Sequence, residues 1–135
     1  MPFEITRSLA THQAEKLAEI EALRLVKNNQ PILYGGMTID ADTVARENIN
    51  GKIVEISAKI DLGITTAEMF WKDSTNTIHS WPTLAEYLVF LKGLAIAIAE
   101  RNTLLYGISW TKKAAVLALT SLFDVTSYDV DKGWI

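Results

Sequence analysis

The chain has 135 residues, a formal net charge of −3 and no cysteine. This length is sufficient for one domain with its own hydrophobic core. The absence of cysteine excludes disulfides, thiolate metal sites and a cysteine nucleophile, and the slightly acidic balance lacks the basic footprint of nucleic-acid binding. With 49% hydrophobic and 21% charged residues, the composition is that of a globular protein. The first residues lack the basic and apolar pattern of a signal peptide, so none is expected.

The first predicted element is an amphipathic helix. Residues 1–7 are expected to form a short lead-in, and Ser8 is a candidate N-cap for a helix over residues 8–28. Leucine, isoleucine and alanine recur on one face, and charged residues occupy the other. The helix is expected to end before Pro31, because the residue preceding a proline disfavours helical angles. It either projects as an oligomerisation arm or folds back on the domain.

Two β-hairpins are predicted in the middle of the chain. Residues 31–40 form two short apolar runs around a Gly-Gly pair, and both glycines can take the positive φ of a tight turn. Residues 67–72 and 77–81 are rich in aromatic and β-branched side chains and flank the turn-forming tetrad 73–76. We therefore expect one hairpin on each side of the intervening segment.

That intervening segment is predicted to be a helix over residues 43–62. Asp40 or Asp42 is its expected N-cap, and Gly63 is its expected C-terminal stop. Gly51 lies in the middle, where glycine costs about 1 kcal/mol relative to alanine. This position predicts a close approach of another element.

Residues 84–99 form the most apolar run of the chain. Thr83 and Glu86 fit a capping box, which marks the start of a helix. The helix is apolar nearly all round, so we expect it to be buried on most sides. The run is shorter than the ~20 residues of a membrane span, and Glu86 and Lys92 interrupt it, so no membrane association is expected.

The helical pattern continues through residues 100–122. Gly107 weakens its middle, which predicts either one long helix bent there or two helices with a joint. Asp124 is a candidate cap for a short helical turn, and Trp134 is expected to pack the remaining tail. The predicted order indicates a helix-rich α+β fold: an amphipathic helix, two β-hairpins around a middle helix, and a long C-terminal helical region. Residues 1–15 are interpreted as the lead-in and start of the helical arm, and residues 16–135 as a single domain.

Two aspartate pairs invite a metal interpretation. Asp40 and Asp42 are too few ligands for a divalent cation, and helix capping explains them better, with Arg46 one turn on as a partner for Asp42. Residues 129–133 carry a second pair but lack the remaining ligands of a calcium loop, so they are interpreted as a turn. No metal site is expected.

No catalytic constellation is recognisable either. His12 and His79 have no paired nucleophile in the sequence and are interpreted as surface histidines. The Gly-Gly pair at 35–36 is not a phosphate-binding loop. An enzymatic function and a bound cofactor are therefore not expected.

Several stretches of the chain form a recognisable series. KLAEIEALR at residues 16–24 is a helix, and GMTIDAD at 36–42 and RENING at 46–51 give a hairpin, an acidic step and a helix with an early arginine. FWKD at 70–73, the return strand at 76–83 and DVDKGW at 129–134 complete the series. In these stretches the chain resembles a family of small phage and prophage tail proteins that accompany tail fibres. It departs from the family pattern at Thr43, where serine is frequent.

The resemblance implies a tail fibre assembly factor that acts as a chaperone in the host cytoplasm by contact with a fibre or other tail protein. A structural component retained in the virion tail is the alternative, and a carbohydrate-binding module using the tryptophan hairpin is the third. A homo-oligomer is compatible with each. The expected contact residues are two tryptophans and one apolar face of the long helix: Trp71, Trp81, Leu88, Leu91, Ile98 and Leu105.

Overall fold

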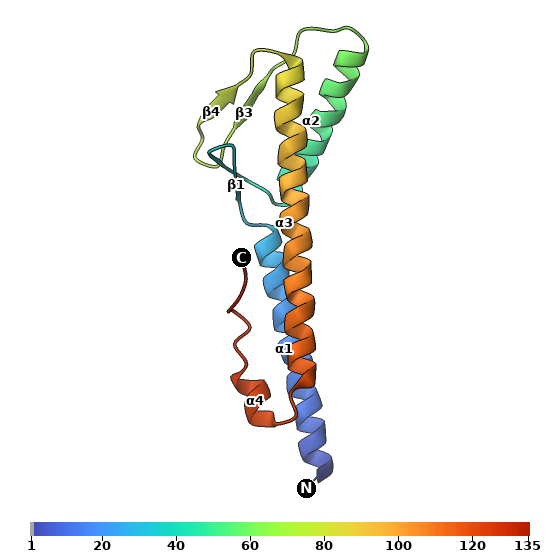
Figure 1. The fold of residues 1–135 in the computed structure, drawn as a ribbon, viewed down its shortest axis with the longest axis vertical. Helices are drawn as coiled ribbons and strands as arrows, with labels where there is room; N and C mark the ends of the chain where they lie inside the picture. The colour runs from blue at the N-terminus through green and yellow to red at the C-terminus, as the bar shows by residue number, and fades with distance from the viewer. Residues whose placement is uncertain (1) are drawn as a thin grey trace. The chain divides into compact units, whose positions relative to one another are not determined.

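A computed structural model describes the backbone of residues 2–135 and the side chains of residues 8–135. The chain is a helix-rich α+β protein with two separate antiparallel hairpins of two strands each, as predicted (Figure 1). It divides into two compact units. The hairpin unit is Asn29–Arg101, and the terminal unit consists of residues 2–28 together with Asn102–Ile135.

The elements follow one another in nearly the predicted order. The helices are α1 (Pro2–Asn28), α2 (Thr43–Asp61), α3 (Leu84–Ala118) and α4 (Leu122–Ser127). The strands are β1 (Ile32–Tyr34), β2 (Met37–Ile39), β3 (Phe70–Lys72) and β4 (Ile78–Ser80). Strand β1 pairs with β2, and β3 pairs with β4. Helix α3 supplies residues up to Arg101 to the hairpin unit and residues from Asn102 to the terminal unit.

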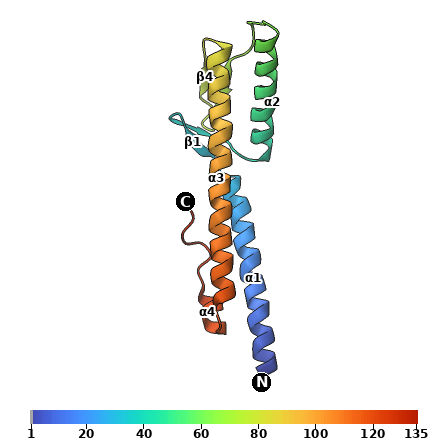
Figure 2. The same cartoon turned by 45° about the vertical axis from the view of Figure 1, so that its right-hand side comes forward.

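The core of the hairpin unit lies where α2 and both hairpins pack against the first part of α3 (Figure 2). Its buried members are Ile39, Ala41, Ile49, Ile56, Leu84, Tyr87, Phe90, Leu91, Leu94 and Ile98. In α3, five of these residues follow one another at alternating steps of three and four, the period that keeps side chains on one face of a helix, and Phe90 adjoins them: Leu84, Tyr87, Leu91, Leu94 and Ile98. The hairpin unit is therefore an α+β core assembled on a single apolar helix face.

Local sequence signals set the ends of α2 and the turn of the first hairpin. Gly35 and Gly36 have φ of 57° and 77°, which confirms the predicted tight turn. Asp42 is the N-cap of α2 and accepts a 2.8 Å hydrogen bond from the amide of Ala45. Gly63, at φ 72°, follows the C-cap, so its predicted role as the helix stop is also confirmed.

Gly51 does not mark a close approach, so that expectation is wrong. A Cβ atom built on Gly51 would meet nothing within 4 Å. The tightly packed glycine is Gly93 in α3, where a Cβ atom would lie 1.9 Å from the hydroxyl oxygen of Tyr34. The first hairpin thus packs its tyrosine directly on the backbone of α3.

Helix α3 is continuous through Gly107, so the alternative of two jointed helices is wrong. The hydroxyl of Thr83 accepts a 3.2 Å hydrogen bond from the amide of Glu86, as the capping box predicted. The expectation that this helix is buried on most sides is wrong for one face. Val89 and Ile96 are 72% and 58% exposed, because the surrounding elements cover only the face that carries the core residues.

The ends of the chain differ from the prediction in two places. Helix α1 already begins at Pro2, so Ser8 lies inside it and is not its cap. Proline suits the first helical position, because its missing N–H would lack a helical partner there in any case. Met1 lies outside the described residues. In α4 the N-cap is Ser121, whose hydroxyl accepts a 3.1 Å hydrogen bond from the amide of Asp124, so Asp124 is a first-turn residue and not the cap.

In the terminal unit, α1 packs within the unit and its side chains satisfy groups at the end of α3. The amide nitrogen of Gln13 lies 3.3 Å from the carbonyl oxygen of Val116 and 3.1 Å from that of Leu119. The last carbonyls of a helix have no partner within the helix, so Gln13 supplies one from outside. This arrangement favours the folded-back alternative for α1 over a free arm.

Candidate interaction surfaces

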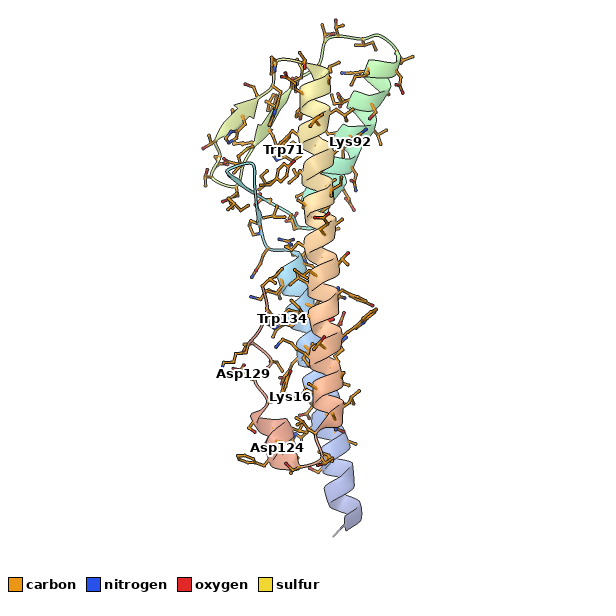
Figure 3. The ribbon with its side chains drawn as sticks, viewed as in Figure 1. Lys16, Trp71, Lys92, Asp124, Asp129 and Trp134 are labelled. Atoms are coloured by element: carbon orange, nitrogen blue, oxygen red, sulfur yellow. The ribbon has the colours of Figure 1, made fainter. Side chains whose placement is uncertain are left out.

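The two hairpin tryptophans are both half-buried in the hairpin unit, in different surroundings. Trp81 stacks on Phe90 and Tyr87, with ring centroids 4.2 and 5.2 Å away. Trp71, labelled in Figure 3, lies in β3. It is opposite His79 of β4 and lines a groove between β3 and α2. The two indoles line different hollows of the surface, so they do not act together as one aromatic platform.

A buried aspartate organises the turn of the second hairpin. The carboxylate of Asp73 accepts hydrogen bonds from the amides of Thr75 and Thr77 at 2.9 and 3.0 Å and from the Thr75 hydroxyl at 2.7 Å. Its second oxygen lies 2.8 Å from Nε2 of His79. The bonds from His79 and Thr75 lower the pKa of Asp73 below its usual value. His79, predicted as an isolated surface histidine, is therefore part of this turn and helps to fix the strand that carries Trp71.

The four residues predicted to form an apolar contact face on the long helix differ in how far they are buried. Leu91, Ile98 and Leu105 are 0%, 3% and 1% exposed, so they are core residues in this conformation. Leu88 is half-buried against the core of the hairpin unit. Three of the four therefore cannot reach a partner unless the unit opens, and the available apolar surface lies elsewhere on the helix.

An exposed aromatic surface of the terminal unit lies on α3. Tyr106, Trp110 and Leu117 are 43%, 61% and 58% exposed. Their spacing of four and seven residues places them on one face of the helix, which we call the Trp110 surface. The rings of Tyr106 and Trp110 meet edge to face, with centroids 4.8 Å apart. Trp110 was not among the residues predicted from the sequence, although its position four residues after Tyr106, away from the buried face of the helix, was a signal for it.

Charged side chains from α1 border this surface. The guanidinium of Arg24 lies 4.8 Å from the ring centroid of Tyr106 and is hydrogen-bonded to the carboxylate of Glu21. Lys113 of α3 binds the other oxygen of Glu21 at 2.6 Å. The bonds from Arg24 and Lys113 lower the pKa of Glu21 to about 2. An exposed aromatic centre with a charged edge is the usual composition of a protein-binding surface.

This charged edge predicts a pH dependence of stability. Because the folded-state pKa of Glu21 is about 2 and its reference value is 4.5, its contribution is complete above pH 4.5 and is lost as the pH falls towards 2. Since the group is partly exposed, we expect Glu21→Gln to lower the free energy of unfolding at pH 7 by only about 0.5–1 kcal/mol. Urea unfolding of both proteins at several pH values measures this difference. A difference that does not shrink on acidification would contradict the assigned ion pairs.

Lys112 of α3 holds the C-terminal segment in the terminal unit. Trp134 packs against this lysine, as its predicted packing role leads us to expect. Lys112 is 8% exposed, and its ammonium group is hydrogen-bonded to the carbonyl oxygen of Lys132. The ring centroids of Trp134 and Tyr128 lie 5.4 and 5.9 Å from it, within cation–π distance. Figure 3 labels Trp134. The backbone between them forms a turn, as predicted, in which the amide of Asp131 donates to the carboxylate of Asp129 at 3.0 Å.

Neither aspartate pair assembles a metal centre in the part of the chain that the structure describes, where no group of three or more His, Cys, Asp or Glu could hold an ion. Arg46 was expected to pair with Asp42. Its Nε instead lies 3.3 Å from the backbone oxygen of Asp42, because the carboxylate is already engaged as the N-cap. His12 lies 3.3 Å from the carboxylate of Glu15 on the same helix.

Across residues 2–135, no helix is both long and apolar enough to cross a membrane.

Comparison with known proteins identifies the family. A family model described as "Domain of unknown function (DUF4376)" matches residues 11–131, so the chain belongs to this family. No curated protein and no solved structure matches it significantly. The match covers α2, both hairpins, α3 and α4 entirely and most of α1, so both units belong to the family domain.

Proposed function

We propose that this chain is a phage tail fibre assembly factor that acts by protein–protein contact, with the Trp110 surface as its principal contact. The Trp110 surface is the observation that carries the proposal. The sequence resemblance to proteins that accompany tail fibres supplies the class of partner. The activity is that of a chaperone in the host cytoplasm that leaves before the virion is complete.

An exposed tryptophan leaves apolar surface in water, and a partner that covers this surface gains binding energy. Trp110 leaves 61% of its surface in water, together with neighbouring surface of Tyr106 and Leu117. Burying apolar surface contributes about 25 cal/mol per Å². Tryptophan, tyrosine and arginine dominate the binding energy of protein interfaces, and Arg24 completes that set here. The edge-to-face contact with Tyr106 also holds the indole in place before a partner arrives, which lowers the entropic cost of binding.

The proposed mechanism is temporary covering of apolar surface and strand edges on a fibre subunit before it assembles. Such surfaces aggregate when they are exposed during folding. The Trp110 surface covers a complementary apolar patch, while the charged edge formed by Glu21, Arg24 and Lys113 keeps the free factor in solution. Release follows when the fibre subunits bury that patch against one another.

The test is a binding titration with the fibre subunit of the same phage. Trp110→Ala is expected to weaken binding by about 30-fold, the effect of losing a hot-spot residue worth roughly 2 kcal/mol. The matched control is Phe123→Ala, which removes another ring that is 76% exposed in the same unit but lies on α4. Circular dichroism establishes that both variants are folded. Equal affinity of the wild type and Trp110→Ala would refute the assigned surface.

A further inference from the structure

A groove of about 520 Å³ lies between α2 and β3 in the hairpin unit. Its α2 side is formed by residues one turn apart, with Gly51 between Glu47 and Glu55, and its β3 side includes Trp71. The volume falls in the ~300–1,000 Å³ range of small-molecule sites. All lining residues belong to this one unit.

Gly51 is the feature that the fold itself does not explain. It lies within α2, its φ is not positive, and a Cβ atom there would meet nothing within 4 Å. Neither a turn nor a close contact therefore requires glycine, although glycine is a much poorer helix former than alanine. Because Gly51 has no side chain, the groove stays open at this position. A ligand can therefore approach the helix backbone closely there.

The polar side chains around this opening are largely unengaged. Glu47, Asn48, Glu68 and Lys72 line the groove, and their side chains make no hydrogen bond or ion pair with any residue that the structure describes. The indole N–H of Trp71 likewise has no acceptor among the described residues. The two glutamates supply negatively charged hydrogen-bond acceptors, and Lys72 supplies one cation. The Asn48 amide both donates and accepts hydrogen bonds.

The tryptophan of the groove is held in place before any ligand binds. The hydroxyl of Tyr87, itself 0% exposed, donates a 2.8 Å hydrogen bond to the carbonyl of Phe70, the residue before Trp71. Across the hairpin, His79 is opposite Trp71 and bound to Asp73. A fixed backbone on both strands makes the site pre-organised, which reduces the entropy lost on binding.

We propose that this groove binds a neutral saccharide of the hexose type, with Trp71 against the apolar face of the ring and Glu47, Asn48 and Glu68 on its hydroxyls. A sugar ring presents C–H groups on one face and hydroxyls that both donate and accept around its edge, which matches an indole surrounded by acceptors and donors. A phosphorylated ligand does not fit, because Lys52 is already paired with Glu55 and carboxylates outnumber the remaining cation. The proposal is independent of the Trp110 surface and of the assembly role.

The experiment is an NMR titration of the full chain, labelled with ¹⁵N, with glucose, galactose, mannose, N-acetylglucosamine and their disaccharides. We expect at least one of them to bind with a Kd of roughly 1 mM, as the usual ligand efficiency predicts for a molecule of this size. The shifted amides are expected to lie in α2 and β3, and the Trp71 indole resonance is expected to move with them. Gly51→Leu, which fills the groove, is expected to weaken binding at least tenfold.

Gly107→Leu is the matched control, because it makes the same change in a helix of the other unit, at a position where a Cβ atom also meets nothing within 4 Å. Retained binding by Gly107→Leu with loss in Gly51→Leu supports the site. Three results would each overturn it: no binding to any sugar of the panel, shifts outside α2 and β3, or equal binding by the two variants. None of them bears on the fibre-subunit titration.

Discussion

Tyr87→Ala is expected to lower the free energy of unfolding of the hairpin unit by about 3–5 kcal/mol. Tyr87 is 0% exposed and lies at the centre of the core, where Trp81 stacks on it at 5.2 Å. Truncation removes the ring and leaves a cavity beneath Trp81. It also leaves the carbonyl of Phe70 without its 2.8 Å hydrogen bond from the Tyr87 hydroxyl. Chemical unfolding followed by tryptophan fluorescence measures the loss.

Tyr87→Phe separates the two contributions. It keeps the ring and removes only the hydroxyl, so we expect a loss of about 1–2 kcal/mol from the unsatisfied carbonyl. Burial raises the pKa of Tyr87 to about 12, so the hydroxyl remains protonated and a donor in any neutral buffer. A Tyr87→Ala variant as stable as Tyr87→Phe would contradict the central place of this ring in the core.

Gly93→Ala is expected to destabilise the same unit by about 1–3 kcal/mol, the usual cost of inserting a methyl group into packed surroundings. The new Cβ atom would lie 1.9 Å from the Tyr34 hydroxyl oxygen and 3.1 Å from the ring carbon that carries it. Tyr34 cannot yield freely, because its ring packs at 5.8 Å from that of Phe90. The hairpin β1–β2 must therefore shift away from α3.

A double-mutant cycle tests this contact. With Tyr34→Ala in the background, Gly93→Ala meets no ring and is expected to stabilise α3 by about 1 kcal/mol through helix propensity. Gly107→Ala, in open space on the same helix, is expected to give that stabilisation in the wild type. Equal effects of Gly93→Ala in the presence and absence of the Tyr34 ring would show that the contact is not the cause.

Local signals explain why the order of elements could be predicted from the sequence. Asp42, Gly63 and Thr83 act through neighbours within four residues, so their roles at helix ends are legible in a short stretch of chain. The glycine pair of the first hairpin is equally local. The start of α1 was missed because a proline at the first helical position suits a helix as well as a lead-in.

The contact surfaces depend on tertiary packing and could not be predicted in the same way. Helix α3 is apolar on several faces, so its sequence does not decide which face the other elements cover. The structure places Leu91 and Ile98 inside and leaves Val89 and Ile96 outside. Gly51 shows the same limit, because a glycine in the middle of a helix indicated a special position but not whether the space beside it was filled or open.

Mass spectrometry of purified phage particles tests the assembly role most directly, with peptides of this chain quantified against the major tail protein and against the infected-cell lysate. We expect the chain to be abundant in the lysate, in complex with the fibre subunit, and absent from finished particles. A fixed stoichiometry in the particles would contradict an assembly factor that leaves and would assign the chain to the tail structure.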